Sequence, residues 1–167
     1  MKKLFVVCGL LFLTASVVMA HPHFRKTTTV KMGEQEVSVS FRTVPANMSR
    51  LEGIADGEFV SPGQPSLKVS AALKAGSASI PAGTYLVGAV KKGDGWTMAL
   101  YPGKLERGEK PDLSKAIKLD SQFNTSTDDA EHLVVDIGPG WGKNQGKAVV
   151  LIGFGTLWLD GAISDAQ

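Results

Sequence analysis

The sequence has only one cysteine, Cys8, and it lies close to the N-terminus of the 167-residue chain. Beyond it the chain therefore has no intramolecular disulfide, no thiolate nucleophile and no cysteine-based metal site. Aromatic residues are also scarce, at 7% of the chain. A chain without covalent links must be held together by its hydrophobic core, and this one is long enough to bury a single core.

An excess of charge of either sign is absent as well. The chain has 18 Lys and Arg residues against 16 Asp and Glu residues, and Lys2 and Lys3 account for the difference of two. Beyond these two lysines the formal charge is near zero. A neutral chain has no electrostatic attraction to nucleic acids or to an anionic membrane surface. We therefore expect no nucleic-acid partner.

A long apolar run with positive flanking charge occurs only at the start of the chain. Lys2 and Lys3 precede the unbroken apolar segment Leu4–Leu13, and Val18–Ala20 matches the small-residue pattern of a cleavage site. This order is typical of a secretory signal peptide. The alternative is an uncleaved anchor, but the segment falls short of the roughly 18–20 apolar residues that span a bilayer. We predict a signal peptide over residues 1–20, no membrane insertion after cleavage, and a periplasmic or secreted protein.

The stretch Ser79–Lys104 contains the strongest signal for structure. Thr84–Val90 and Trp96–Tyr101 are apolar at both alternating sets of positions, and the polar, glycine-containing segment Lys91–Gly95 separates them. Strands that are apolar on both faces lie inside a sheet that is covered on both sides. The short glycine loop indicates a hairpin. We expect this hairpin to lie at the centre of the fold, with Tyr85 buried.

The rest of the chain also has the patterns of short strands, with no sustained period of 3.6 residues. Val44–Pro65 is irregular, with a single helical turn possible around Met48–Ile54, and Ser121–Glu131 is polar and expected to be rich in turns. We predict one domain over residues 21–167 with an all-β fold: a single antiparallel β-sandwich, with a barrel as the alternative, of about eight or nine short strands. The further expected strands are Thr27–Met32, Glu36–Thr43, Leu67–Leu73, a short one through Ile117 and Leu119, His132–Ile137, Lys147–Phe154 and Thr156–Ala162.

The central hairpin resembles a known family. The run Ile80–Tyr85 (IPAGTY) followed by Trp96–Leu100 (WTMAL) is similar to DUF2911, a bacterial domain family of unknown function in which an "IPAGTYSL" run precedes a "DEWTVIFN"-like strand. The likeness covers Leu67–Lys104, and the sequence departs from the family pattern in Val44–Pro65. The resemblance implies an exported β-sandwich-like domain and no particular activity.

The sharpest chemical hypothesis concerns the histidines. Cleavage after Ala20 would give His21 a free α-amine, so that its amine and imidazole could chelate a metal together with His23. Such an N-terminal histidine resembles those of secreted copper proteins, including the CopC-type carriers and the lytic polysaccharide monooxygenases. Nitrogen ligands suit Cu(II) or Ni(II), and Cu(II) is favoured by the order of affinities. Because Pro22 lacks an amide proton, a further ligand is needed, and His132 is a candidate.

Other binding chemistries have weaker patterns. Asp128, Asp129 and Glu131 could supply another ligand to that metal or hold Ca²⁺, but their spacing matches no EF-hand loop. The loop 138–147 is rich in glycine but fails the P-loop pattern. The aromatic residues could form a platform for carbohydrate, although such residues more often pack in a core. These residues are Tyr85, Trp96, Tyr101, Trp141 and Trp158.

Nucleophilic catalysis has no support, because the body of the chain has no cysteine and no Gly-x-Ser-x-Gly motif. The sequence thus predicts an exported, small, non-catalytic binding or interaction domain whose partner is an unknown small ligand or protein, without a cofactor. The alternative function is a periplasmic copper-binding or copper-carrying protein that uses His21, with His23 or His132.

Overall fold

The computed structural model describes residues 24–106 and 108–166, which fold into eleven strands and three short 3-10 helices. The side chain of Asp128 is outside this description. The elements are β1 (Arg25–Met32), β2 (Gln35–Arg42), η1 (Met48–Arg50), β3 (Phe59–Val60), β4 (Ser66–Val69), β5 (Leu73–Ala75), β6 (Ala78–Ile80), β7 (Gly83–Lys92), β8 (Gly95–Pro102), η2 (Leu113–Lys115), β9 (Ile117–Lys118), β10 (Asp120–Pro139), η3 (Gly142–Asn144) and β11 (Ala148–Asp165).

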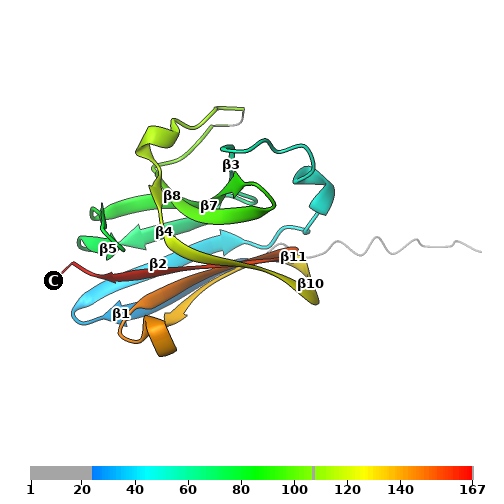
Figure 1. The fold of residues 1–167 in the computed structure, drawn as a ribbon. Helices are drawn as coiled ribbons and strands as arrows, with labels where there is room; N and C mark the ends of the chain where they lie inside the picture. Colours follow the sequence, from blue (N-terminus) through cyan, green and yellow to red (C-terminus); the bar gives the residue numbers. More distant parts are fainter. Residues whose placement is uncertain (1–23, 107, 167) are drawn as a thin grey trace, which may run out of the picture.

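The strands form two antiparallel sheets that face each other (Figure 1). One has the order β1-β2-β4-β7-β8-β9, with β3 also paired to β7, and the other has the order β10-β11-β5-β6. Aliphatic side chains from both sheets fill the space between them, among them Val39, Leu67, Leu100, Val135 and Val150. The prediction of an all-β sandwich is confirmed. Among the described residues, no helix reaches the length and apolarity that crossing a bilayer requires.

The central hairpin is also as predicted. β7 pairs with β8 from Tyr85↔Pro102 to Lys92↔Gly95. Tyr85 and Trp96 point into the inter-sheet core and are buried. On the other face of the hairpin, side chains such as Leu86 and Tyr101 are buried too, but they are not part of that core. Both faces are therefore covered, as the two-sided apolar pattern indicates.

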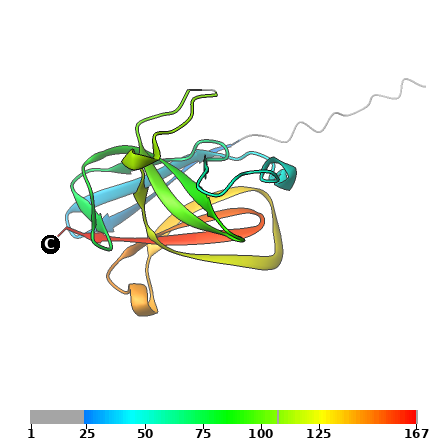
Figure 2. The same cartoon turned by 45° about the horizontal axis from the view of Figure 1, so that its top comes forward.

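The cover over the second face comes from β3. Phe59 lies over Gly88 of β7, where the glycine leaves room for its ring, and its centroid is 6.0 Å from that of Tyr101. β3 is fixed there by its pairing with Val90 and Ala89. The irregular segment 44–65 thus supplies part of a sheet, whereas the connection between β8 and η2 (residues 103–106 and 108–112) projects beyond both sheets (Figure 2).

One predicted strand is wrong. The segment Leu67–Leu73 is not a single strand, because β4 ends at Val69 and pairs in the large sheet, whereas β5 begins at Leu73 and pairs in the small one. The alternating pattern nevertheless continues, since Leu67, Val69, Leu73 and Ala75 are all buried. Both sheets face the same core, so a chain that crosses between them keeps its apolar residues on one side.

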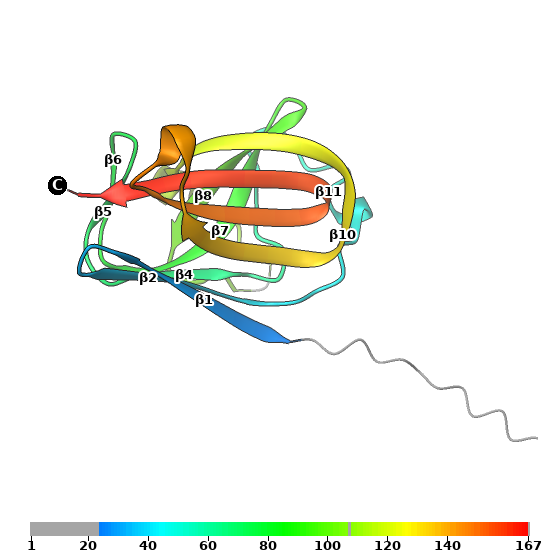
Figure 3. The same cartoon turned by 90° about the horizontal axis from the view of Figure 1, so that it is seen from below.

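The expectation of turns over Ser121–Glu131 is also wrong, because these residues belong to β10, which pairs with β11 from Asp120↔Ala162 to Pro139↔Ala148. The register shifts between Thr125↔Leu157 and Val134↔Gly153, so that β10 advances nine residues there (125 to 134) while β11 advances four (153 to 157). β10 therefore follows the longer, outer path of a bend. Figure 3 shows the two-stranded ribbon folding back on itself at this point.

The bend has a backbone cause on each strand. In β11, Gly155 has φ +59°, a conformation that is open mainly to glycine. In β10, the extra residues form bulges that bend a strand without ending its pairing. The serines and threonines of this stretch suit a strand at the edge of a sheet with one face in water. A polar composition alone therefore does not separate a wet edge strand from a loop.

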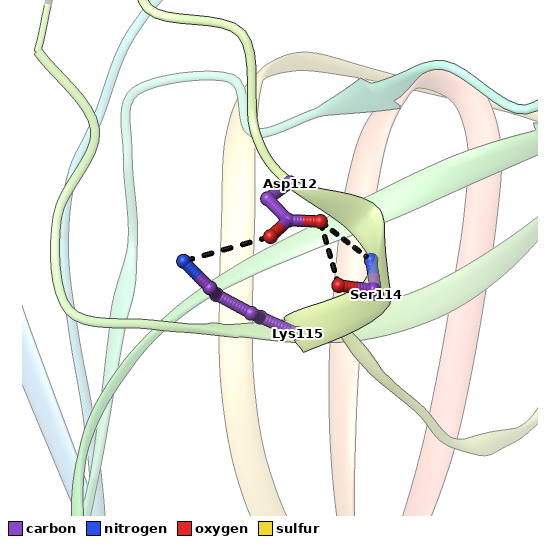
Figure 4. Close-up of polar contacts among 3 residues, drawn as sticks. All are labelled: Asp112, Ser114 and Lys115. Atoms are coloured by element: carbon purple, nitrogen blue, oxygen red, sulfur yellow. Dashed lines mark hydrogen bonds and ion pairs between the residues drawn. The ribbon is translucent and has the colours of Figure 1, made fainter.

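Two of the short 3-10 helices begin with a side-chain cap, and only the first of them was predicted from the sequence. The helical turn expected around Met48–Ile54 is η1, whose N-cap Asn47 accepts a hydrogen bond from Ser49 N at 3.1 Å. η2 has the same type of cap, and Figure 4 shows its contacts. Asp112 Oδ1 accepts from Ser114 N at 3.1 Å and from Ser114 Oγ at 2.7 Å. These bonds, together with Lys115 Nζ at 3.5 Å from Oδ2, lower the pKa of the Asp112 carboxyl.

Candidate functional site

The five aromatic side chains that could form a binding platform do not lie together. Tyr85, Trp96 and Tyr101 are buried, with exposed fractions of 5%, 8% and 7%. Trp141, by contrast, is 88% exposed, and Trp158 is half-buried on the outside of the small sheet. The packing interpretation is therefore correct for three of the five. Among the other two, Trp141 is exposed and Trp158 is partly covered by its neighbours.

Tyr85 illustrates why the buried aromatic residues have a structural role. Its hydroxyl donates a hydrogen bond to the carbonyl oxygen of Pro81 at 2.6 Å, and burial raises the pKa of its hydroxyl. A buried tyrosine needs such a partner for its polar end. The bond joins the start of β7 to the turn before it, so Tyr85 fixes the entry to the central hairpin.

Trp141 is held by a tight loop between β10 and β11. Gly140 N donates to Lys147 O at 2.8 Å, Asn144 N to Trp141 O at 2.9 Å, and Lys147 N to Asn144 O at 3.0 Å. A side chain at Gly140 would collide with the Asn144 backbone, so the loop needs glycine there. The backbone of Trp141 is thus fixed while its ring lies in water. Burying so large an apolar side chain would gain about 1.5–3 kcal/mol, so the fold leaves this stabilisation unused.

A cleft of about 290 Å³ opens beside this ring. Trp141 and Asn144 line it from the loop, and Val149 and Leu151 line it from β11. The neighbours of these two aliphatic residues, such as Val150, belong to the buried core. Because side chains alternate along a strand, Val149 and Leu151 point away from the core. The cleft therefore lies on the outer face of the sandwich and not between the sheets.

Two carboxylates complete the lining of the cleft. Asp136 is the register partner of Leu151; its Oδ1 accepts from Ile137 N at 3.0 Å, and its Oδ2 lies 3.8 Å from Lys26 Nζ. Asp160 Oδ1 accepts from Gln122 N at 3.0 Å. Backbone donors thus hold both carboxylates in place. Of the residues that line the cleft, only these two are titratable, and the rest are apolar apart from Asn144.

Trp158 belongs to the same outer face. If Gly153 had a side chain, its Cβ would lie 2.7–2.9 Å from ring atoms of Trp158, so the ring packs directly against that glycine. Gly153 shares its face of β11 with Val149 and Leu151, and Trp158 shares its face with Asp160. We use the term ribbon face for the outward side chains that these observations bring together: Asp136, Trp141, Val149, Leu151, Trp158 and Asp160.

Of the three histidines predicted as metal ligands, only His132 lies among the described residues. His21 and His23 lie outside them, so the copper hypothesis stays a prediction. His132 is half-buried in β10, within the register shift between Ala130 and Val134, and it forms a bridge with Pro45. Phe24, the first described residue, accepts a backbone hydrogen bond from Thr43, two residues before Pro45. Within residues 24–106 and 108–166, no group of three or more histidine, cysteine or acidic side chains is placed to hold a metal ion.

The carboxylates of the ribbon face were not identified from the sequence. The predicted strand Lys147–Phe154 corresponds to the first part of β11, which lies between β10 and β5 in the small sheet. The structure shows that one face of this strand is partly open, at Val149 and Leu151. The signal that could have found the site is Trp141, because a tryptophan between glycines in a loop has no core to enter.

Comparison with known proteins gives no match: no protein-family model, no curated protein and no solved structure resembles the chain significantly. The resemblance of Leu67–Lys104 to DUF2911 stays a prediction.

Proposed function

We propose that the protein is an exported, non-catalytic binding domain that takes its ligand on the ribbon face. The observation that carries this proposal is the exposed ring of Trp141, held by a hydrogen-bonded loop beside a cleft with aliphatic and carboxylate side chains. Binding sites combine an apolar or aromatic surface with a few fixed polar groups. Export rests on the signal-like pattern of residues 1–20.

The composition of the cleft supports a role in binding. Its lining contains no histidine, cysteine, serine or lysine, so the only side chains in it that could act as a general base or a nucleophile are the two carboxylates. Its two carboxylates are both engaged by backbone N–H donors. Such fixed acceptors orient a bound molecule. The DUF2911 resemblance agrees with the exported β-sandwich domain and says nothing about an activity.

The proposal is tested with a ligand library and a matched pair of variants. Trp141→Ala removes the exposed ring, and Phe24→Ala removes the other large hydrophobic side chain that is exposed among the described residues, at 63%. A thermal-shift screen of oligosaccharides, peptides and lipids should find a ligand whose effect is lost in Trp141→Ala and kept in Phe24→Ala. A library without any Trp141-dependent ligand would contradict the proposal, and so would turnover of a bound ligand that ceases on Asp136→Asn or Asp160→Asn.

A further inference from the structure

We infer that the ligand of the ribbon face is a neutral oligosaccharide, an inference that rests on the proposed function. The exposed indole of Trp141 suits the stacking of a sugar ring. A pyranose ring has one face of C–H groups and a rim of hydroxyls, so it can cover an aromatic ring while its hydroxyls stay in water or bind acceptors. Tryptophan offers the largest apolar surface with few rotatable bonds. Trp141 offers this surface from a loop that three backbone hydrogen bonds hold in place.

The polar groups beside the ring can hydrogen-bond to sugar hydroxyls. Asp160 uses Oδ1 for the Gln122 amide, and its Oδ2 forms no hydrogen bond with the described residues. Carboxylate oxygens have several lone pairs and accept more than one hydrogen bond. The side-chain amide of Asn144 offers both a donor and an acceptor at the same cleft. A molecule rich in hydroxyl groups needs both hydrogen-bond acceptors and donors, and the acceptors predominate in this cleft.

The negative charge of the cleft favours neutral ligands over anionic ones. Its lining carries two carboxylates and no cationic side chain, so a uronate, sulfate or phosphate would meet like charge. A cationic peptide is the competing occupant. Asp136, however, already lies 3.8 Å from Lys26 Nζ, and Asp160 already accepts a backbone N–H. These carboxylates are better suited to hydroxyl donors than to a second cation.

The length of the ribbon face indicates an oligosaccharide and not a single sugar. Trp141 lies at the loop end of the ribbon, and Trp158 packs against Gly153, farther along β11. At the rise of an extended strand, Val149 and Gly153 are roughly 13 Å apart. This length exceeds one pyranose ring. The ribbon face therefore suits a chain of linked sugars. It has a tryptophan toward each end, and Leu151 and Asp160 lie between them.

The test is calorimetric titration of the purified full-length protein with four probes: cellohexaose, chitohexaose, hexagalacturonate and hexalysine. We expect a neutral hexasaccharide to bind and hexagalacturonate to bind at least about tenfold more weakly. In Trp141→Ala the affinity for the neutral probe should fall about tenfold, with partial recovery in Trp141→Phe and no change in Phe24→Ala. Circular dichroism confirms that each variant is folded.

The outcomes separate the two proposals. Equal or tighter binding of hexagalacturonate, or hexalysine as the only probe that binds through Trp141, would overturn the saccharide inference and leave the ribbon face as a binding site. Saccharide binding that is unchanged in Trp141→Ala would overturn the placement of the site. If neither the four probes nor the wider library yields a Trp141-dependent ligand, both proposals fail.

Discussion

Gly88 is the position at which the two-sided cover of the central hairpin can be tested most sharply. It lies in the middle of β7, and a Cβ built there falls on the carbonyl oxygen of Val60 and 2.5 Å from Phe59 Cζ. The Phe59 ring can rotate away, but the Val60 carbonyl belongs to the backbone of β3. Gly88→Ala must therefore either displace β3 or shift β7 within the sheet.

The magnitude follows from two opposing effects. Overpacking typically costs about 1–3 kcal/mol, and a clash with backbone belongs at the upper end of that range. Replacing glycine by alanine also restricts the unfolded chain, which offsets about 0.4–1 kcal/mol. We therefore expect Gly88→Ala to lower the free energy of unfolding by about 2 kcal/mol. The hydrogen bond from Ser61 Oγ to Val87 O, now 2.7 Å, is among the contacts that the shift would weaken.

A matched control exists in β10. A Cβ at Gly138 would have no neighbour within 4 Å, and the backbone there does not need glycine. Gly138→Ala should keep full stability or gain up to about 1 kcal/mol. Urea unfolding followed by tryptophan fluorescence measures both variants. If Gly88→Ala unfolds at the same urea concentration as the unmodified protein, or if both variants lose the same stability, the packing of β3 on β7 is not as described.

Three further predictions concern single side chains. Tyr85→Phe should lower the free energy of unfolding by about 1 kcal/mol, because the hydrogen bond to Pro81 is lost. Since burial raises the pKa of the Tyr85 hydroxyl, the stabilising effect of this residue should fall as the pH rises above the ordinary pKa of tyrosine. The titration is followed by the absorbance of the tyrosinate, and an unshifted pKa would contradict this prediction. The pKa of the Asp112 carboxyl is lowered in the folded protein. The stability that Asp112 contributes through the η2 cap is therefore present above the pKa of the unfolded chain and is lost as the pH falls through the pKa of the folded protein. Ser114→Ala should return the pKa of Asp112 toward its ordinary range in an NMR titration, and an unchanged value would refute the cap. Trp141→Ala should alter the free energy of unfolding by less than about 0.5 kcal/mol, because the ring is 88% exposed; a larger loss in urea unfolding would show that the ring is structural.

The sandwich and its central hairpin were predictable because burial on both faces leaves a pattern in the sequence itself. Along β7 and β8 almost every position is apolar, and the turn between them has the glycines that a hairpin needs. The helical turn at η1 was predictable in the same local way, from residues close together in the chain. Alternation could not show that β4 and β5 belong to different sheets, since both sheets bury the same face of the chain.

The ribbon face was harder to predict because it depends on contacts between distant residues. Asp136 and Asp160 line one cleft only because the β10–β11 ribbon folds back on itself. That bend depends on a register shift in β10, in a stretch whose polar composition indicates turns. No local pattern encodes such a pairing. Trp141 alone could be identified, from its position in a glycine-rich loop.

The most direct test of the ribbon face as the binding surface is an NMR titration of the isotope-labelled protein with the neutral hexasaccharide that binds. We predict that the indole N–H of Trp141 and the backbone amides of Leu151 and Asp160 shift together. The amides of the central hairpin β7–β8 should keep their positions. Shifts that cluster on β7–β8 or on β1–β2, with the Trp141 indole unmoved, would contradict the account.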